Sequence, residues 1–241
     1  MKLATATATA EDYQRIFDLE RQQSYPMVDA LEQRMGFTVD RERLEAAARV
    51  LACPLKDAAP CWQHGRVLYT AVRNYLATTT EECVRTLDIG TAKGFSALVV
   101  VMAADDAEFP AEVFSVDVLP PSARVRRNTV AEVDGLKTLA EILAPWPEAS
   151  RITFLESTGI DWLKAHPERI HIAFVDGKHS GSVVRQEGVL LAQRQQTGDL
   201  CIFDDVHIGE VSVAVTSLHH EYKLEYLQVL PKRAYAIGVR R

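Results

Sequence analysis

Acidic residues follow two apolar runs in the second half of the chain, and their chemistry could hold a metal ion. Asp176 follows residues 170–175, and Asp204 and Asp205 follow residues 200–203. If both runs are parallel strands, their carboxyl ends meet at the edge where open α/β sheets bind ligands. Three neighbouring carboxylates repel one another unless a cation neutralises them, and oxygen ligands suit Mg²⁺. We therefore predict Asp176, Asp204 and Asp205 as Mg²⁺ ligands, although acids at strand ends also cap helices without a metal.

Three further side chains near these acids are candidates for moving a proton. His179 has an ordinary pKa of about 6.5, so it could act as a general base near neutral pH. Lys178 is a second candidate. His207 is a third, or it lies beside the metal as a fourth group. A metal or base here would deprotonate a hydroxyl group and turn it into an oxygen nucleophile.

A second group of candidate residues surrounds the sequence LDIGTAKGFS, which runs from Leu87 to Ser96. Gly90 allows a tight backbone turn, and Gly94 opens the following helix beside a ligand. The pattern D-x-G-x-x-x-G differs from the G-x-G-x-x-G of dinucleotide sites. Asp88 would repel a phosphate but suits a ligand with an ammonium group, such as S-adenosylmethionine (SAM), whose carboxylate could lie near Ser96. The alternative is a strand, turn and helix in which the glycines serve geometry alone.

A further acid, Asp117, ends the next apolar run, residues 113–116. By the rule for nucleotide-binding folds, an acid at this place is positioned to hydrogen-bond ribose hydroxyls. Together with the glycine loop, it favours a nucleoside cofactor that carries no phosphate.

Short apolar runs alternate with helical stretches after Cys83, which predicts a mostly parallel sheet with helices on both faces. The predicted strands are 84–89, 113–116, 152–155, 170–175, 200–203, 227–230 and 234–239. The predicted helices among them are 95–104, 125–143, 160–165 and 182–195. Only three residues separate the last two strands, so these should form an antiparallel hairpin. Residues 11–77 show helical spacing and predict three or four helices, the last at 62–75.

Composition narrows the class of protein. The chain has 241 residues, 47% hydrophobic and 25% charged, as in soluble globular proteins. A net charge of −6 argues against a nucleic-acid partner, because such binding relies on positive charge. The four cysteines lack metal-site spacing, which predicts free thiols in a reducing compartment. The sequence shows no secretory signal, and its longest apolar run, 97–104, is too short to cross a membrane. We expect a cytoplasmic protein without a membrane partner.

The glycine loop, Asp117 and the terminal hairpin resemble those of class I SAM-dependent methyltransferases, over about residues 62–241. The resemblance implies an α/β fold with a doubly wound, seven-stranded, mostly parallel Rossmann-like sheet, a C-terminal antiparallel hairpin and N-terminal helices. It implies that the methionine end of SAM lies on the glycine loop, the ribose at Asp117, and the adenine near Ser157 and Thr158. The predicted cofactor contacts are Asp88, Gly90, Thr91, Gly94, Ser96, Asp117, Ser157, Thr158 and Asp176.

The sequences VDGKHS and FDDV around the acids are similar to those of catechol O-methyltransferases and of metal-dependent sugar and natural-product O-methyltransferases. They also resemble a group of methyltransferases with D-G-D-H-S-Y at the first place. Lys178 stands where that group has an acid, and Gly181 where it has tyrosine. The catechol enzymes have a lysine base three residues after the metal-binding acid, and His179 occupies that position here.

We therefore predict a SAM-dependent methyltransferase that acts on a small-molecule acceptor, at a hydroxyl oxygen and with Mg²⁺ assistance. Residues 1–61 are expected to form a helical lid or the interface of a homodimer, and residues 62–241 the methyltransferase domain. Two alternatives remain open. One is a non-catalytic subunit with the same fold, which the departures at Lys178 and Gly181 allow. The other is a nicotinamide-dependent oxidoreductase, which Asp88 disfavours.

Overall fold

The computed structural model describes residues 8–55, 61–125, 127–133 and 135–241. Its centre is a seven-stranded sheet with the order β3-β2-β1-β4-β5-β7-β6. The strands are β1 (Val84–Ile89), β2 (Ala111–Asp117), β3 (Ile152–Glu156), β4 (Ile172–Val175), β5 (Leu200–Phe203), β6 (Tyr222–Leu230) and β7 (Arg233–Arg240). The first five strands are parallel, and β7 pairs antiparallel with both β5 and β6. This confirms the predicted Rossmann-like sheet with a C-terminal hairpin.

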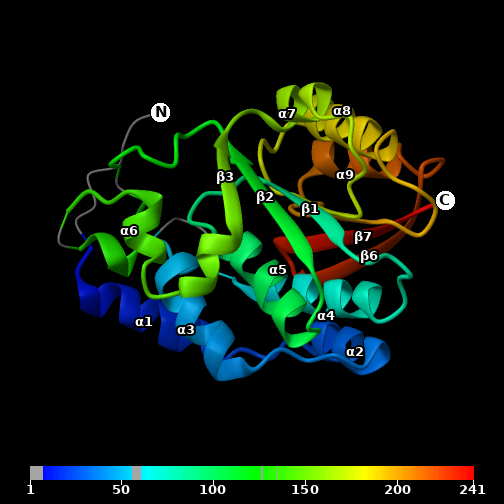
Figure 1. Cartoon of the computed structure of the whole chain (residues 1–241). Helices are drawn as coiled ribbons and strands as arrows, with labels where there is room; N and C mark the ends of the chain where they lie inside the picture. The colour runs from blue at the N-terminus through cyan, green and yellow to red at the C-terminus, as the bar shows by residue number, and fades with distance from the viewer. Residues whose placement is uncertain (1–7, 56–60, 126, 134) are drawn as a thin grey trace.

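Helices cover both faces of the sheet, with α4 and α5 on one face and α7, α8 and α9 on the other (Figure 1). The helices are α1 (Ala10–Arg21), α2 (Pro26–Met35), α3 (Arg41–Leu51), α4 (Gln63–Leu76), α5 (Phe95–Asp106), α6 (Leu139–Leu143), α7 (Gly159–Ala165), α8 (Gly181–Ala192) and α9 (Gly209–Thr216). None of the helices in the described part of the chain is long and apolar enough to cross a membrane.

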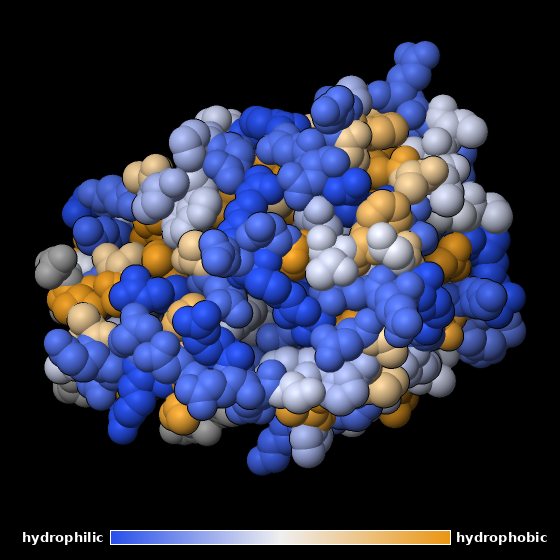
Figure 2. Space-filling model, turned by 90° about the horizontal axis from the view of Figure 1, so that it is seen from below, coloured by the Kyte–Doolittle hydropathy of each residue, from blue (hydrophilic) through white to orange (hydrophobic). Residues whose placement is uncertain are grey.

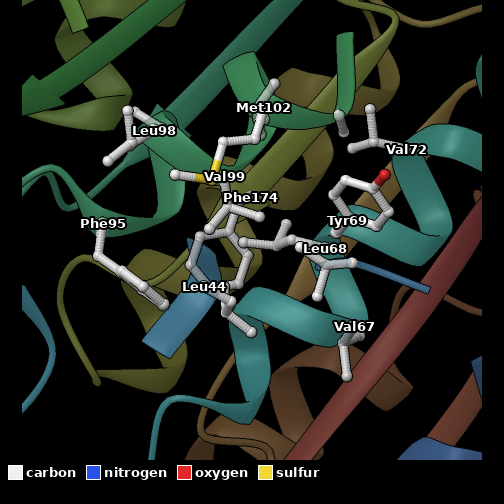
Figure 3. Packing of buried hydrophobic residues seen from close by; sticks show 14 of the residues in the cluster. Leu44, Val67, Leu68, Tyr69, Val72, Phe95, Leu98, Val99, Met102 and Phe174 are labelled. Carbon is white, nitrogen blue, oxygen red and sulfur yellow. The ribbon is translucent and has the colours of Figure 1, made fainter. Parts of the chain in front are cut away.

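The alternation of side chains along the central strands explains why both faces are apolar. In β4, Ile172 and Phe174 join the cluster under α4 and α5, while Ala173 and Val175 join the cluster under α8 and α9. Parallel strands covered on both faces need such continuous apolar runs. Figure 3 shows Phe174 gathered with side chains of α4 and α5. Helix α5 is buried over residues 95–104, so its run of apolar residues serves the core.

The N-terminal helices share this core with the sheet. Phe17, Leu31 and Leu44 belong to the same buried cluster as Phe174, so apolar packing continues across the predicted boundary at residues 61 and 62. Residues 1–7 and 56–60 of the predicted N-terminal segment lie outside the described residues. The face seen in Figure 2 is mostly hydrophilic, with small separate apolar groups.

The structure differs from the predicted elements in several places, and β6 begins at Tyr222, five residues before the predicted strand. The predicted helix 125–143 is replaced by a 3₁₀ turn at Val130–Glu132, an antiparallel bridge between Val125 and Lys137, and the short helix α6. Residues 126 and 134 of that range lie outside the described residues. Asn128 is left-handed with φ 57°, and a Thr138 capping box starts α6, so the local chemistry favours a turn and a late helix start. Helix α9 was not predicted, because its three β-branched valines resemble a strand.

Gly90 allows the ends of β1 and β4 to approach each other, and this generates a first prediction. Its φ is +104°, and a Cβ there would overlap the Asp176 carbonyl oxygen. We expect Gly90→Ala to lower the free energy of unfolding by about 3 kcal/mol, because it adds both a clash and backbone strain. Urea unfolding followed by circular dichroism measures this.

Gly209→Ala is the matched control, because a Cβ at Gly209 meets nothing within 4 Å and the residue begins a helix. That variant should unfold within about 0.5 kcal/mol of the parent or be slightly more stable. Equal unfolding midpoints for the two variants would contradict the steric role of Gly90.

Candidate functional site

A cavity of about 880 Å³ lies at the carboxyl ends of the parallel strands. Its walls come from the segments that follow β1, β2, β3, β4 and β5, together with β7 and the N-terminal helices. Gly90, Asp117, Ser157, Asp176 and Asp205 all line it, one from each of the five strand ends. The fold therefore brings into one cavity the segments that the sequence analysis selected separately.

The glycine loop forms one wall of this cavity. Gly90, Thr91 and Ser96 line it. The Thr91 hydroxyl and that of Ser115 lie 2.7 Å apart, which holds the loop against β2. Gly94 is the left-handed N-cap of α5, with φ +82°, but it is not among the described residues that line the cavity. A Cβ on Gly94 would instead face Leu143 at 3.1 Å, so this glycine serves the start of the helix and its packing.

Asp88 differs from its predicted role as a direct ligand contact. Its side chain is 2% exposed and is not among the described cavity-lining residues. The hydroxyls of Ser96 and Ser115 donate to its two carboxylate oxygens, at 2.7 and 2.5 Å. Because strand residues alternate, Leu87 and Ile89 face α7 and α8 while Asp88 points below α5. Asp88 therefore positions Ser96, which does line the cavity.

Asp117 lies on the cavity wall with its carboxylate held by two backbone amides. Ala92 donates to one carboxylate oxygen at 2.9 Å, and Leu119 donates to the other at 2.9 Å. These two bonds fix the carboxylate at the edge of the glycine loop and leave each oxygen a further lone pair for a ligand.

The segment after β3 lines the cavity beside Asp117. The Thr158 hydroxyl caps α7, because it accepts from the Asp161 amide at 3.0 Å and donates to the Asp161 carboxylate at 2.7 Å. The Ser157 hydroxyl donates to the Thr158 carbonyl at 3.0 Å. Both hydroxyl protons are therefore engaged within the segment, although their oxygens can still accept.

The three predicted metal ligands are only partly brought together. Asp176, His179 and Asp205 each place one potential ligand atom within 4.8 Å of the other two. Asp204 lines the cavity but is not part of this group, because its carboxylate turns back to accept from the Asp205 amide at 2.5 Å. Asp205 itself is left-handed, with φ 53°, which separates the directions of the two neighbouring side chains. The arrangement thus replaces the predicted third carboxylate with an imidazole.

The three proton-transfer candidates occupy different positions. His179 is half exposed, and its Nδ1 lies 3.0 Å from Asp205 Oδ2. Lys178 also lines the cavity. His207 is not among the described lining residues, and its Nδ1 is 3.6 Å from Asp205 Oδ1, too far for a hydrogen bond. Burial lowers the pKa of His207, so it is neutral near pH 7. His179 and Lys178 therefore both line the cavity, and His179 also contacts Asp205.

Asp176 lies close to two other carboxyl groups, and this crowding disfavours its charged form. Burial, followed by repulsion from Asp204 and Asp205, raises the pKa of Asp176 well above its ordinary value. Arg233, which the sequence analysis did not select, donates to Asp205 Oδ1 at 3.1 Å and partly offsets this charge. Its position at the start of the second hairpin strand is the one feature of the sequence that could have indicated a place near the strand ends. A cation bound beside Asp176 would be strongly favoured by these carboxylates.

Gly181 has a structural reason to depart from tyrosine. A Cβ there would lie 2.6 Å from the Glu210 carbonyl oxygen, and the Gly181 amide donates to the Glu210 carboxylate at 2.8 Å. The start of α9 therefore occupies the space that a larger side chain would need.

The burial of Asp88 generates a prediction about pH. Burial raises its pKa to about 6 although two serine hydroxyls favour the charged form. Between pH 4 and pH 6 the folded protein holds a proton that the unfolded chain releases, so the free energy of unfolding falls as pH rises through this window. The loss should total about 3 kcal/mol and be complete above the folded pKa.

Asp88→Asn isolates this effect, because the amide does not titrate. Urea unfolding of both proteins at pH 4.5 and pH 7.5 should show the parent losing more stability than the variant as pH rises. A parallel change in the two proteins would contradict a buried, titrating Asp88.

Comparison with known proteins agrees with this geometry. Residues 87–206 match the family described as a methyltransferase domain. No match is found among the curated proteins. The cofactor-bound protein Rv0187 from MTB shares the fold at 16% identity, with a TM-score of 0.57 and 98% of this chain and 99% of that chain covered.

Two solved O-methyltransferases also share the fold. TomG from Streptomyces achromogenes, in complex with SAM, is 14% identical with a TM-score of 0.56, covering 85% of this chain and 92% of that chain. The O-methyltransferase from Bacillus cereus, in complex with SAH, is 14% identical with a TM-score of 0.55, covering 97% and 98%. Residues 87–206 therefore resemble a methyltransferase domain, and the chain has the Rossmann-like fold of these solved methyltransferases.

Proposed function

We propose that this protein transfers the methyl group of SAM to an oxygen atom of a small-molecule acceptor. The observation that carries the proposal is the single cavity that joins the glycine loop and Asp117 to Asp176, His179 and Asp205. A nucleoside cofactor on the first set of residues would place its sulfonium beside the second set. The fold shared with two solved O-methyltransferases supports oxygen as the acceptor atom.

The cofactor half of the cavity fits a nucleoside. Asp117 offers carboxylate lone pairs to ribose hydroxyls while backbone amides hold it in place. Val118 and Ile160 line the cavity on either side of the Ser157 segment and provide apolar surface for a base. Ser96 lines the loop end, where the amino acid part of SAM would lie.

The acceptor half fits a divalent cation, although the donor set is mixed. Asp176, His179 and Asp205 would hold it through two carboxylates and one imidazole. This set suits Mn²⁺ or Zn²⁺ as well as the Mg²⁺ expected from oxygen ligands alone. When bound, such a cation lowers the pKa of an acceptor hydroxyl. Arg233 already contacts Asp205, so the cation would share that carboxylate with it.

His179 can also act as a base without a metal. With a proton on Nδ1 it donates to Asp205, as the 3.0 Å distance allows, and its Nε2 is free to accept the proton of an acceptor hydroxyl. A bond then forms between the acceptor oxygen and the methyl carbon as the bond from carbon to sulfur breaks, leaving S-adenosylhomocysteine (SAH). Because a neutral imidazole has only one unprotonated nitrogen, it cannot bind a cation and accept a proton at the same time, and the two roles of His179 are alternatives.

The N-terminal helices close the acceptor half, which supports a small acceptor. Leu51, Cys61 and His64 line the cavity, and the Cys61 sulfur lies 4.0 Å from the Tyr235 hydroxyl. Burial raises the pKa of the Cys61 thiol to about 11, so it stays protonated and does not compete as a nucleophile. We therefore assign the described part of the N-terminal segment, through Leu51, Pro54 and Cys61, to a wall of the acceptor site in preference to an interface between subunits.

The role of Asp117 gives a test of cofactor binding. Titration calorimetry should detect SAH binding to the parent, and Asp117→Asn should weaken it about tenfold or more, because ribose hydroxyls lose a charged acceptor. Glu112→Gln, an exposed change in the same strand, should leave the affinity unchanged.

Titration with NAD separates the nicotinamide alternative. Binding of NAD without SAH would reject the proposal. SAH binding together with failure to methylate any of a panel of phenols, catechols and sugars would favour the non-catalytic subunit.

The mixed donor set gives a test of metal binding. Titration of the parent with Mg²⁺ and Mn²⁺ should show one site, and Asp176→Asn and His179→Ala should each weaken Mn²⁺ binding about tenfold or more. Asp204→Asn should have a smaller effect, because Asp204 lies outside the group. If no metal binds, or if His179→Ala leaves the metal affinity unchanged, the role of His179 as a ligand is wrong and its role as a base is favoured.

A further inference from the structure

Glu187 of α8 is a buried carboxyl group at the cavity that has no assigned role. It lines the cavity, yet its side chain is only 2% exposed. Its Oε2 atom is buried and has no hydrogen-bond partner among the described residues. Burial alone raises the pKa of Glu187 to about 7, and no neighbouring cation opposes this shift.

The sequence pattern of α8 calls for an apolar residue at this place. The buried face of the helix includes Val184 one turn before Glu187, Gly188 next to it, and Leu191 one turn after it. An unpaired carboxyl group within such a stripe costs free energy of folding, because it loses its contacts with water. A residue that is unfavourable for folding at a cavity wall points to a contact that is made only when a ligand binds.

The position of Glu187 indicates which part of a bound cofactor it would contact. A Cβ on Gly159 would lie 2.5 Å from Glu187 Oε1, so the carboxyl group touches the first residue of α7. Gly159 directly follows Ser157 and Thr158, the segment expected to hold the base of the cofactor. Gly159 also packs against Ile89, and any larger residue there would displace Glu187. The carboxyl group thus lies beside the segment expected to hold the base.

We propose that Glu187 recognises the base of the cofactor by accepting a hydrogen bond from the exocyclic amino group of adenine. This inference rests on the proposed SAM binding and names a specificity residue within it. A carboxyl group accepts from the amino group in either protonation state, and when neutral it can also donate to an adjacent ring nitrogen. The contact supplies the partner that the buried Oε2 lacks. With this contact, the cavity is expected to favour adenine over a base without an amino group.

The test is a binding cycle with two ligands. One is SAH, and the other is its analogue in which purine, without the 6-amino group, replaces adenine. Calorimetry on the parent should show the analogue binding about tenfold more weakly than SAH. Glu187→Leu should bind SAH about tenfold more weakly and should no longer distinguish the two ligands. Glu187→Gln should keep most of the discrimination, because its amide oxygen still accepts.

Gln186→Leu is the matched control, since Gln186 is the exposed neighbour of Glu187 on the same helix. It should behave as the parent with both ligands. Thermal unfolding checks folding, and Glu187→Leu should be at least as stable as the parent because it removes a buried carboxyl group.

Two results would overturn the inference while leaving SAM binding intact. One is unchanged SAH affinity in Glu187→Leu. The other is a loss in Glu187→Leu that is the same for SAH and the analogue, so that discrimination persists without the carboxyl group. Failure of the parent to bind SAH at all would overturn the proposed function and this inference with it.

Discussion

The close contact between the ends of β1 and β4 is the constraint on which the site depends. Gly90 has no side chain, so its backbone can lie against the Asp176 carbonyl, and the Asp176 amide donates to Ile89 at 2.9 Å. This contact joins the loop that would hold the cofactor to the acid that would face the acceptor. With a wider spacing, the two halves of the cavity would be separate sites, and a methyl group could not pass between them.

Buried carboxyl groups surround this contact, and each has a different environment. Asp88 is satisfied by two serine hydroxyls, Asp205 by Arg233 and His179, and Asp176 by no described hydrogen bond to its side chain. Glu187 also lacks a donor for one oxygen. Asp88, with both oxygens bonded to serine hydroxyls, holds the framework. Asp176 and Glu187 keep oxygens without a described protein donor, so a ligand could bond to them.

The sequence predicted the sheet well, because its strands are short apolar runs that end at acids or glycines. The bounds of β1 and β5 agree with the predicted ranges, and the hairpin followed from a gap too short for a crossover. Asp88 lies beneath α5 and is not among the described residues that line the cavity, and the alternation of Leu87, Asp88 and Ile89 along β1 could have indicated this direction. The loop after β4 brings the imidazole of His179 to Asp205. The spacing of residues in the sequence does not predict this contact. The predicted helix at 125–143 was wrong, because the residues in this range favour turns more strongly than their apolar spacing favours a helix.

The shared core beneath the N-terminal helices determines how an acceptor can enter. Phe17, Leu31 and Leu44 pack in the same cluster as Phe174, so swinging this layer outward as a rigid door would expose the apolar underside of the sheet to water. We therefore expect an acceptor to enter through movements of side chains and short connecting segments, without movement of the whole helical layer. A substitution that loosens the packing of the N-terminal helices on this cluster is therefore expected to change both the stability of the protein and the opening of the cavity.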